Sequence, residues 1–270
     1  MRTTASGPRR GCETLASMCG RYAASRKPED LVEEFEVDRV MVRESLEPDF
    51  NVAPTKNVYA VLEREPREAP ADAPPERRLT VVRWGLVPSW AKDPSIGNRL
   101  INARMETVAE KPSFRRAFAS RRCLLPADGY FEWYATSNKT AKGKPVKQPF
   151  FIHPADNGVL AMAGLYEIWR DRSRDEDDAE AFRWTCTVLT TTAEDAVGQI
   201  HDRMPLLVER ERYDAWLDPR TDDKDSLLSL LVPAAPGRLE AFPVSTMVNN
   251  VRNNGPELVE PMAAEPQGPQ

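Results

Sequence analysis

The sequence lacks a long hydrophobic run. In this chain of 270 residues the longest uncharged apolar stretch extends only from Gly158 to Tyr166, whereas a helix needs ~20 apolar residues to span a bilayer. Hydrophobic residues make up 41% and charged residues 29% of the chain, which is ordinary for a soluble globular protein. The composition therefore excludes a transmembrane helix, a disordered chain and a fibrous protein, and a cytoplasmic location is expected.

Metal-ligating residues are also scarce. The chain has four cysteines without a C-x-x-C pair and only two histidines, His153 and His201. This pattern does not indicate a zinc site, and neither a metal nor another cofactor is expected. Because no secretory signal is present, the thiols are expected to stay reduced. Cys123 and Cys186 lie in strand-like sequence and are interpreted as core residues. Cys19 does not lie in such a sequence.

Residues 1–17 show no targeting pattern. They contain three arginines and one glutamate but no apolar run, and a signal peptide needs about 7 or more apolar residues. We interpret them as a disordered leader or as the result of a start codon assigned too early, since Met18 directly precedes the first patterned segment. Residues 18–261 are predicted to form one domain, because no long linker divides them, and residues 262–270 a loose tail.

Short strands alternate with short helices along the rest of the chain. Pro28 followed by two acids predicts a helix start, and residues 63–78 are predicted to connect two strands of a hairpin. Residues 171–180 hold six acids and two arginines and are predicted to form a solvated loop. Strands are expected at 57–62, 79–87, 123–125, 130–134, 150–153, 159–168, 182–190 and 239–244, and further helices at 114–118, 193–200, 210–216 and 226–231.

Charge is distributed unevenly along the chain. The net charge of -5 argues against a protein that coats nucleic acid nonspecifically. Residues 99–122, however, contain seven basic residues against two acidic ones, which suits contact with a phosphate backbone. Trp84 and Trp90 lie just upstream, and aromatic side chains beside a basic groove stack unpaired bases with ~1–3 kcal/mol per base. Packing of these tryptophans in the core is the alternative.

Cys19 directly follows Met18 and becomes the N-terminal residue if that methionine is removed. An N-terminal cysteine carries two nucleophiles, an α-amine with a pKa of ~7.7–8.0 and a thiol with a pKa of ~8.5. Such a pair condenses with an aldehyde, first to an imine and then to a five-membered thiazolidine ring. From the residue type alone, a small buried residue at the start of a strand is the alternative.

Three further motifs carry candidate site residues. Asn102 and Arg104 are two positions apart and share one face of an extended segment; a turn asparagine and a surface arginine are the alternative. Glu132 lies among aromatic residues, where burial would raise its pKa toward acid/base use, unless it faces solvent. His201 follows a predicted helix and suits a proton shuttle, or else a capping hydrogen bond.

Taken in order, seven motifs resemble the SOS response-associated peptidase (SRAP) family, including its bacterial YedK-like members. The resemblance extends from Met18 to about Pro261. The motifs are MCGRY at 18–22, NVAPT at 51–55, RWGLVPSW at 83–90, NARMET at 102–107, RRCLLPADGYFEW at 121–133, HDRMP at 201–205 and VNNVRNN at 248–254.

This resemblance implies a single α+β domain with a barrel-like antiparallel β-sheet core and flanking short helices. It also implies a monomeric sensor of abasic sites in single-stranded DNA that acts in the DNA damage response. Such a protein forms a covalent DNA-protein cross-link through its N-terminal cysteine, by lyase-like chemistry and without a cofactor, and so shields the lesion.

The resemblance assigns roles position by position. Cys19 is the expected nucleophile, Asn102 orients it or the opened sugar, Glu132 is the acid/base for imine formation, and His201 protonates sugar oxygens during ring opening. The residues expected to contact DNA are Arg21, Arg104 and Arg203, which hold phosphates, and Pro54, Trp84 and Trp133, which line the site.

Two other functions stay open from the sequence: a thiol peptidase or hydrolase that uses Cys19, and a noncovalent module that binds single-stranded DNA. One departure from the family pattern is that seventeen residues precede Met18, and while they persist the amine of Cys19 is an amide and no thiazolidine can form. We therefore expect that translation starts at Met18 with removal of the methionine, or that the leader is cleaved between Met18 and Cys19, including by the protein itself.

Overall fold

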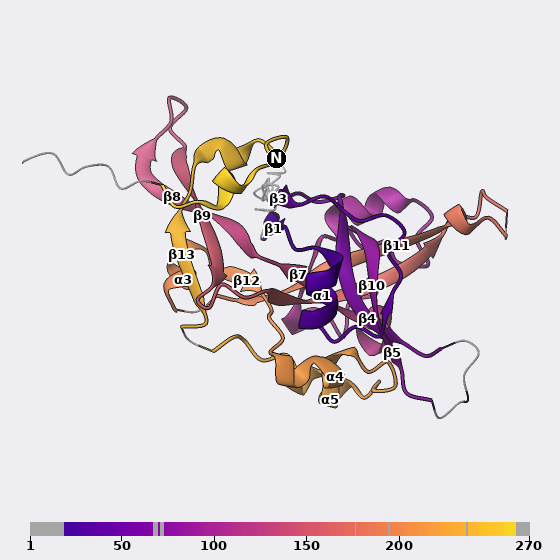
Figure 1. Ribbon diagram of the computed structural model, residues 1–270. Coiled ribbons are helices and arrows are strands. Elements are labelled where there is room, and N and C mark those ends of the chain that lie inside the picture. Colours follow the sequence, from indigo (N-terminus) through magenta and orange to yellow (C-terminus); the bar gives the residue numbers. More distant parts are fainter. Residues whose placement is uncertain are drawn as a thin grey trace, which may run out of the picture.

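Two β-sheets meet in the computed structural model, which describes residues 19–66, 70, 73–175, 177–193, 195–235 and 237–262 (Figure 1). The first sheet has five strands, and every neighbouring pair in it is antiparallel. In spatial order its strands are β13 (Leu239–Pro243), β9 (Pro145–Pro154), β8 (Gly129–Lys139), β1 (Tyr22–Ala24) and β3 (Asp49–Val52).

The second sheet curls into a closed ring. Its strands β11, β10, β7, β4 and β5 are neighbours in that order, and β5 returns to β11 through a parallel pairing of Trp84 with Cys186. The short strands β12, β6 and β2 extend this ring at its edges. The sheet comprises β2 (Arg39–Val40), β4 (Asn57–Arg64), β5 (Glu76–Trp84), β6 (Asn102–Arg104), β7 (Arg122–Ala127), β10 (Leu160–Arg170), β11 (Phe182–Thr192) and β12 (Arg203–Pro205).

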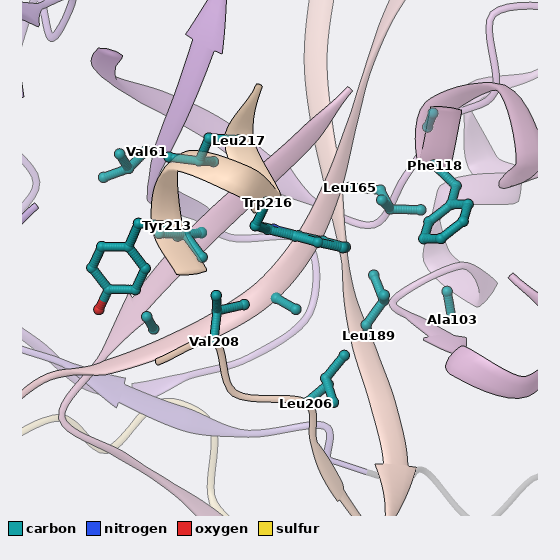
Figure 2. Packing of buried hydrophobic residues seen from close by; sticks show 14 of the residues in the cluster. Val61, Ala103, Phe118, Leu165, Leu189, Leu206, Val208, Tyr213, Trp216 and Leu217 are labelled. Carbon is teal, nitrogen blue, oxygen red and sulfur yellow. The ribbon is translucent and has the colours of Figure 1, made fainter. Parts of the chain in front are cut away.

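The ring strands are buried on both faces, because each face packs against a different layer. On β4, Ala60 and Leu62 belong to a cluster that includes Tyr130 of the first sheet, whereas Tyr59 and Val61 pack in the cluster that includes the helices (Figure 2). The two-residue period of a strand sends successive side chains to opposite faces. An apolar run such as that of β4 is therefore satisfied only in a strand that is covered on both sides.

Four of the five described α-helices cover the second of these faces, and the remaining one, at residues 195–200, contributes Val197 to the cluster on the first face. Helix α1 begins at Pro28, and the Asp30 carboxylate accepts a hydrogen bond of 3.3 Å from the Lys27 backbone N–H, so the predicted helix start is confirmed. The helices are α1 (Pro28–Glu34), α2 (Arg115–Ser120), α3 (Asp195–Ile200), α4 (Tyr213–Leu217) and α5 (Lys224–Ser229), and the 3-10 helices are η1 (Pro94–Arg99), η2 (Met105–Thr107), η3 (Ala179–Ala181), η4 (Arg210–Arg212), η5 (Thr246–Asn249) and η6 (Pro256–Val259).

The predicted α+β fold, a single domain with a barrel-like sheet, is confirmed, and the parallel closure of the ring is an addition that the sequence did not predict. The strand expected at 79–87 ends at Trp84, because Gly85 has a φ of +124°, a backbone conformation that breaks the extended run. The predicted leader at 1–17 and residues 263–270 of the tail predicted at 262–270 lie outside the described residues. None of the described helices is long and apolar enough to cross a membrane.

Candidate active site and DNA interface

Four separate segments bring the predicted catalytic residues together. Cys19 lies three residues before Tyr22, the first residue of β1, and the pairing of β1 with β8 places Cys19 beside Glu132. Asn102 lies on β6, and the parallel pairing of β6 with β11 holds it at this end of the ring. His201 lies between α3 and β12, at the other edge of β11.

Cys19 is buried, with 4% of its surface exposed. Its backbone N–H donates to Glu132 Oε1 at 2.7 Å, and its thiol donates to the Arg203 carbonyl with the sulfur 3.8 Å from the oxygen. Burial, followed by the negative charge of Glu132, raises the pKa of the Cys19 thiol well above its ordinary value. The thiol is therefore protonated in this conformation and needs a proton acceptor before it can act as a thiolate.

Glu132 and His201, the two residues predicted to transfer protons, lie next to each other. Glu132 is 2% exposed, and burial raises the pKa of its carboxyl, an effect that the charge of His201 and the bond from Cys19 partly offset. His201 Nε2 lies 4.0 Å from Glu132 Oε2, and His201 Nδ1 accepts a 3.1 Å hydrogen bond from the Arg203 N–H. In the neutral tautomer that accepts this bond on Nδ1, the proton of the His201 ring lies on Nε2, the nitrogen nearer to Glu132.

The His201 ring has a carboxylate near each of its two nitrogens. The Asp202 carboxylate stands 3.2 Å from His201 Nδ1 on the side away from Glu132. A charged imidazolium would therefore have a carboxylate next to each of its ring nitrogens. Such an arrangement suits a group that takes up and releases a proton during a reaction.

The side chain of Asn102 contacts the backbone of Cys19. Its Nδ2 donates to the Cys19 carbonyl oxygen at 3.4 Å. The preceding residue, Ile101, is fixed through its carbonyl, which accepts a 2.9 Å hydrogen bond from Trp84 Nε1. The position predicted for Asn102 beside the nucleophile is therefore consistent with the structure, and its role in orienting a substrate stays a prediction.

Trp84 lies in the core and not on an open surface. It is 1% exposed, and its ring packs against Tyr22 with centroids 5.1 Å apart. Trp84 was predicted to line the site around unstacked DNA, but its ring has no exposed face on which a base could stack. Its packing is that of a core tryptophan, the alternative given above. Its indole reaches the site indirectly, through Ile101.

Arg21 and Trp133 form one partly exposed unit on the first sheet. The Arg21 guanidinium lies 5.8 Å from the centre of the Trp133 ring and donates to Asn51 Oδ1 at 2.7 Å and to the Val248 carbonyl at 2.9 Å. Trp133 Nε1 donates to Asn249 Oδ1 at 2.7 Å. Both predicted DNA contacts thus stand side by side, with a cationic group on an aromatic face.

The other predicted DNA contacts differ in how accessible they are. Arg104 is exposed, and Pro54 is partly exposed in the turn between β3 and β4. The Arg203 guanidinium is largely buried: Nη2 donates to Glu106 at 3.0 Å and to the Thr190 carbonyl at 2.6 Å. A phosphate would therefore have to share Arg203 with the Glu106 carboxylate, and its phosphate role stays a prediction.

The basic run at 99–122 is only partly a surface. Arg122 is 1% exposed, and its guanidinium donates to backbone carbonyls, among them those of Trp216 at 2.7 Å and Phe118 at 2.8 Å. Burial lowers the pKa of Arg122 to about 10. Arg121 pairs with Glu167 at 3.0 Å. These two arginines stabilise the fold, so fewer than the seven basic residues of the run are available to the phosphate-binding surface predicted from it.

Two residues of the site region were not assigned from the sequence. Asn51 is fully buried, accepts from Arg21, and donates to the carbonyls of Asn250 and Asn253, so the NVAPT and VNNVRNN motifs meet in the fold. The buried Tyr130 hydroxyl has no hydrogen-bond partner among the described residues. Tyr130 shares a face of β8 with Glu132, and this spacing of two was a signal present in the sequence.

The described part of the chain contains no group of three or more His, Cys, Asp or Glu side chains placed to hold a metal ion. The site's own reactive groups are a thiol and a backbone nitrogen on one residue, a buried carboxyl of raised pKa, and an imidazole. These groups suit condensation and proton transfer.

Comparison with known proteins gives consistent relatives. A family model described as SOS response associated peptidase (SRAP) matches residues 18–251. The chain is 38% identical to the abasic site processing protein YoqW of Bacillus subtilis, over 90% of this chain and 99% of that protein. It is 34% identical to the abasic site processing protein YedK of Escherichia coli, over 91% of this chain and 100% of that protein.

Solved structures and a vertebrate relative extend this likeness. The chain is 30% identical to the abasic site processing protein HMCES of Xenopus tropicalis, over 90% of this chain and 78% of that protein. A crystal structure of a protein from Bacteroides thetaiotaomicron superposes with a TM-score of 0.74 at 24% identity, over 91% of this chain and 100% of the other. A phage-related protein from Bordetella bronchiseptica gives 0.60 at 27% identity, over 84% and 94%.

Proposed function

The chain belongs to the SOS response associated peptidase family, and we propose that it captures abasic sites in single-stranded DNA as a covalent thiazolidine cross-link to Cys19. The observation that carries this proposal is the position of the Cys19 nitrogen, 2.7 Å from Glu132 Oε1. His201 Nε2 lies 4.0 Å from the other oxygen of the same carboxylate. The relatives named as abasic site processing proteins support DNA with abasic sites as the substrate.

The reaction begins with opening of the sugar. An abasic deoxyribose is a cyclic hemiacetal in equilibrium with an open aldehyde, and opening requires a proton on the ring oxygen. The imidazolium form of His201, with a proton on Nε2 on the side of Glu132, is the proposed donor, and it becomes the neutral imidazole when this proton passes to the ring oxygen. Asn102, whose amide already bonds the Cys19 carbonyl, is the proposed group that orients the opened sugar.

Condensation follows at the Cys19 nitrogen. The free α-amine attacks the aldehyde carbon to give a carbinolamine, and Glu132 in its protonated form donates a proton to the leaving hydroxyl, so that water departs, Glu132 becomes a carboxylate and a protonated imine (an iminium) remains. The raised pKa of Glu132 keeps part of this carboxyl protonated at higher pH than an exposed glutamate, which suits a general acid.

Ring closure uses the thiol. The Cys19 sulfur adds to the iminium carbon while the thiol proton passes to the Glu132 carboxylate, which restores the protonated acid, and the five-membered thiazolidine results with no net change of oxidation state. Because burial raises the pKa of the thiol, a nearby acceptor for its proton is needed, and Glu132 has just become a carboxylate in the preceding step.

The mechanism requires a free amine at Cys19. We propose that the working form begins at this residue, through a translation start at Met18 with removal of the methionine or through cleavage of a leader between the two residues. In either case the new amine would keep the position from which the Cys19 nitrogen now donates to Glu132.

A denaturing gel of purified protein mixed with abasic single-stranded DNA tests the proposal. Protein that begins at Cys19, as shown by its intact mass, is expected to form a durable cross-link, and protein that retains its leader is expected to fold yet form no thiazolidine. If the leader-bearing form cross-links equally fast and durably, the mechanism through amine and thiol is wrong. Peptide turnover without a cross-link would instead favour a thiol peptidase, and reversible binding alone would favour a noncovalent module.

DNA form provides a second test. Arg21 with Trp133 offers a cation and a partly exposed ring for an unpaired strand, so we expect tighter binding to single strands or strand-duplex junctions than to intact duplex. Binding is expected to weaken as salt rises, through release of counterions. Equal affinity for fully paired DNA, or an affinity independent of salt, would contradict this placement of the interface.

A further inference from the structure

The hairpin between β8 and β9 extends beyond the sheet that holds the site. Residues 134–147, here called the lysine arm, project from the body of the molecule at the upper left of Figure 1. The two strands remain paired along the arm, with Ala135 opposite Lys147 and Lys139 opposite Pro145. The arm is therefore a two-stranded ribbon and not an irregular loop.

The lysine arm carries charge of one sign. It holds four lysines, Lys139, Lys142, Lys144 and Lys147, and no acidic residue, in a chain whose net charge is -5. All four are exposed. None of them forms an ion pair with another residue in the part of the chain that the structure describes. Four positive charges without internal partners are available to an external anion.

The register of the hairpin links the arm to the site. Side chains of directly opposed residues project from the same face of a sheet, and so do residues two apart on one strand. Lys147 is opposite Ala135, which is two residues from Trp133, so Lys147 and Trp133 share a face, the one on which Arg21 lies over the Trp133 ring. The charge of Lys147 also reaches the site, since it lowers the pKa of Glu132, against the larger effect of burial.

We propose that the lysine arm binds the phosphate backbone of the DNA strand on one side of the abasic nucleotide, an inference that rests on the proposed function. A flexible lysine is a point charge that follows a phosphate chain without reading bases, which suits a sensor of lesions in any sequence. The arm thereby extends the interface formed by Arg21 and Trp133 and anchors the strand while Cys19 reacts.

The dependence of affinity on salt tests the arm directly. The triple variant Lys139→Ser, Lys142→Ser, Lys144→Ser leaves Lys147 and the site unchanged. Log K falls as log salt rises, and each phosphate contact that is lost makes this negative slope less steep by about 0.7 to 0.9. We therefore expect the magnitude of the slope to decrease by about 1 to 3 in total. The cross-linking rate at saturating DNA is expected to stay within about twofold, since no residue that touches the reacting atoms has changed.

Two matched variants control for charge and position. Replacing the same three lysines by arginine keeps the charge and is expected to keep the slope. The variant Arg210→Ser, Arg220→Ser, Lys224→Ser removes the same number of positive charges from exposed positions beside α4 and α5, at the bottom of Figure 1, and is expected to leave the slope close to that of the wild type.

Shortening the DNA shows which flank the arm contacts. With oligonucleotides trimmed from either end, the wild type is expected to lose affinity in a step on one side only, and the serine variant is expected to lack that step. An unchanged slope and an unchanged trimming profile, in a serine variant that folds, would overturn the proposal for the arm while leaving the cross-link intact. Failure of the wild type itself to cross-link would instead refute the proposed function.

Discussion

Buried thiols occur in two regions of this protein, in the β-ring and just before strand β1. Cys123 and Cys186 are fully buried in the ring, and burial is the first cause of the raised pKa of each thiol. Cys19 is almost as buried, yet its nitrogen faces a carboxylate and its sulfur faces a backbone carbonyl. Burial alone therefore does not distinguish a core cysteine from a reactive one, whereas the polar groups around it do.

The tryptophans divide in the same way. Trp84 is enclosed by the ring and the first sheet, and its single polar group is satisfied by the Ile101 carbonyl. Trp133 keeps part of its ring exposed beneath the guanidinium of Arg21. A tryptophan in the first setting stabilises the fold, and one in the second is available to a ligand.

Replacing the cysteines one at a time is expected to give the largest difference between the two regions. Cys19→Ala removes the sulfur that closes the ring, so no thiazolidine forms. Cys186→Ala is expected to cross-link like the wild type and to lose stability by about 1 kcal/mol, as is usual for a point substitution. Denaturing gels with abasic DNA and urea unfolding measure the two effects. A hydrolysis-resistant product from Cys19→Ala would show that the nucleophile is misassigned.

Two buried glutamates sharpen the comparison further. Glu132→Gln removes the proposed acid/base group, and such a group is typically worth about 10²- to 10⁴-fold in rate; DNA affinity is expected to change little. Glu167→Gln is the control, because Glu167 is also buried but pairs with Arg121 away from the cysteine. Single-turnover cross-linking at saturating DNA measures both rates. A similar rate for the two variants would argue against the role of Glu132.

The histidines allow the same test of proton transfer. His201→Ala is expected to slow cross-linking within the same range of about 10²- to 10⁴-fold, because ring opening loses its proton donor. His153→Ala is the control, since His153 stacks on Phe151 and its Nδ1 lies 2.9 Å from the Pro154 carbonyl. A substrate trapped in its open form would be expected to reduce the difference for His201→Ala, and an undiminished difference would contradict a role in ring opening.

The tryptophans should separate binding from folding. Trp133→Ala is expected to weaken binding of single-stranded DNA by about 1–3 kcal/mol, the usual value of one stacked base, with a small effect on stability. Trp84→Ala is expected to destabilise the protein by about 3–5 kcal/mol, as is typical for truncation of a large buried aromatic. Fluorescence anisotropy and urea unfolding measure these effects, and a reversed pattern would place Trp84 at the interface after all.

The smallest expected effect is the pH dependence of stability. Folding raises the pKa of Glu132, chiefly by burial, so its contribution to stability is fully present below the unfolded pKa and is lost as pH rises through the folded pKa. Glu132→Gln does not titrate, and it is expected to gain relative to the wild type by up to about 1.4 kcal/mol per pH unit within that window. Urea unfolding from pH 4 upward measures the gap, and a gap that narrows with rising pH would contradict burial as the cause.

Much of the site could be predicted from local sequence. The adjacency of an amine and a thiol at Cys19 depends on one residue type at one position, and the aromatic surroundings of Glu132 indicated burial, which the structure confirms. The alternation of apolar residues predicted strands at most of the observed positions. These features follow from the two-residue period of a strand and from the chemistry of single side chains, which need no knowledge of distant contacts.

The tertiary structure decided which of these residues meet. Cys19 and Glu132 are 113 positions apart and come together only because β1 pairs with β8. Period and composition could not show that Trp84 and Arg122 would be enclosed, because the solvent side of a strand depends on what covers it. The same long-range pairing closes the ring through β5 and β11. The sequence by itself thus determined the candidate reactive groups and the local elements, while the pairing of distant strands determined which groups face one another and which stay exposed to solvent.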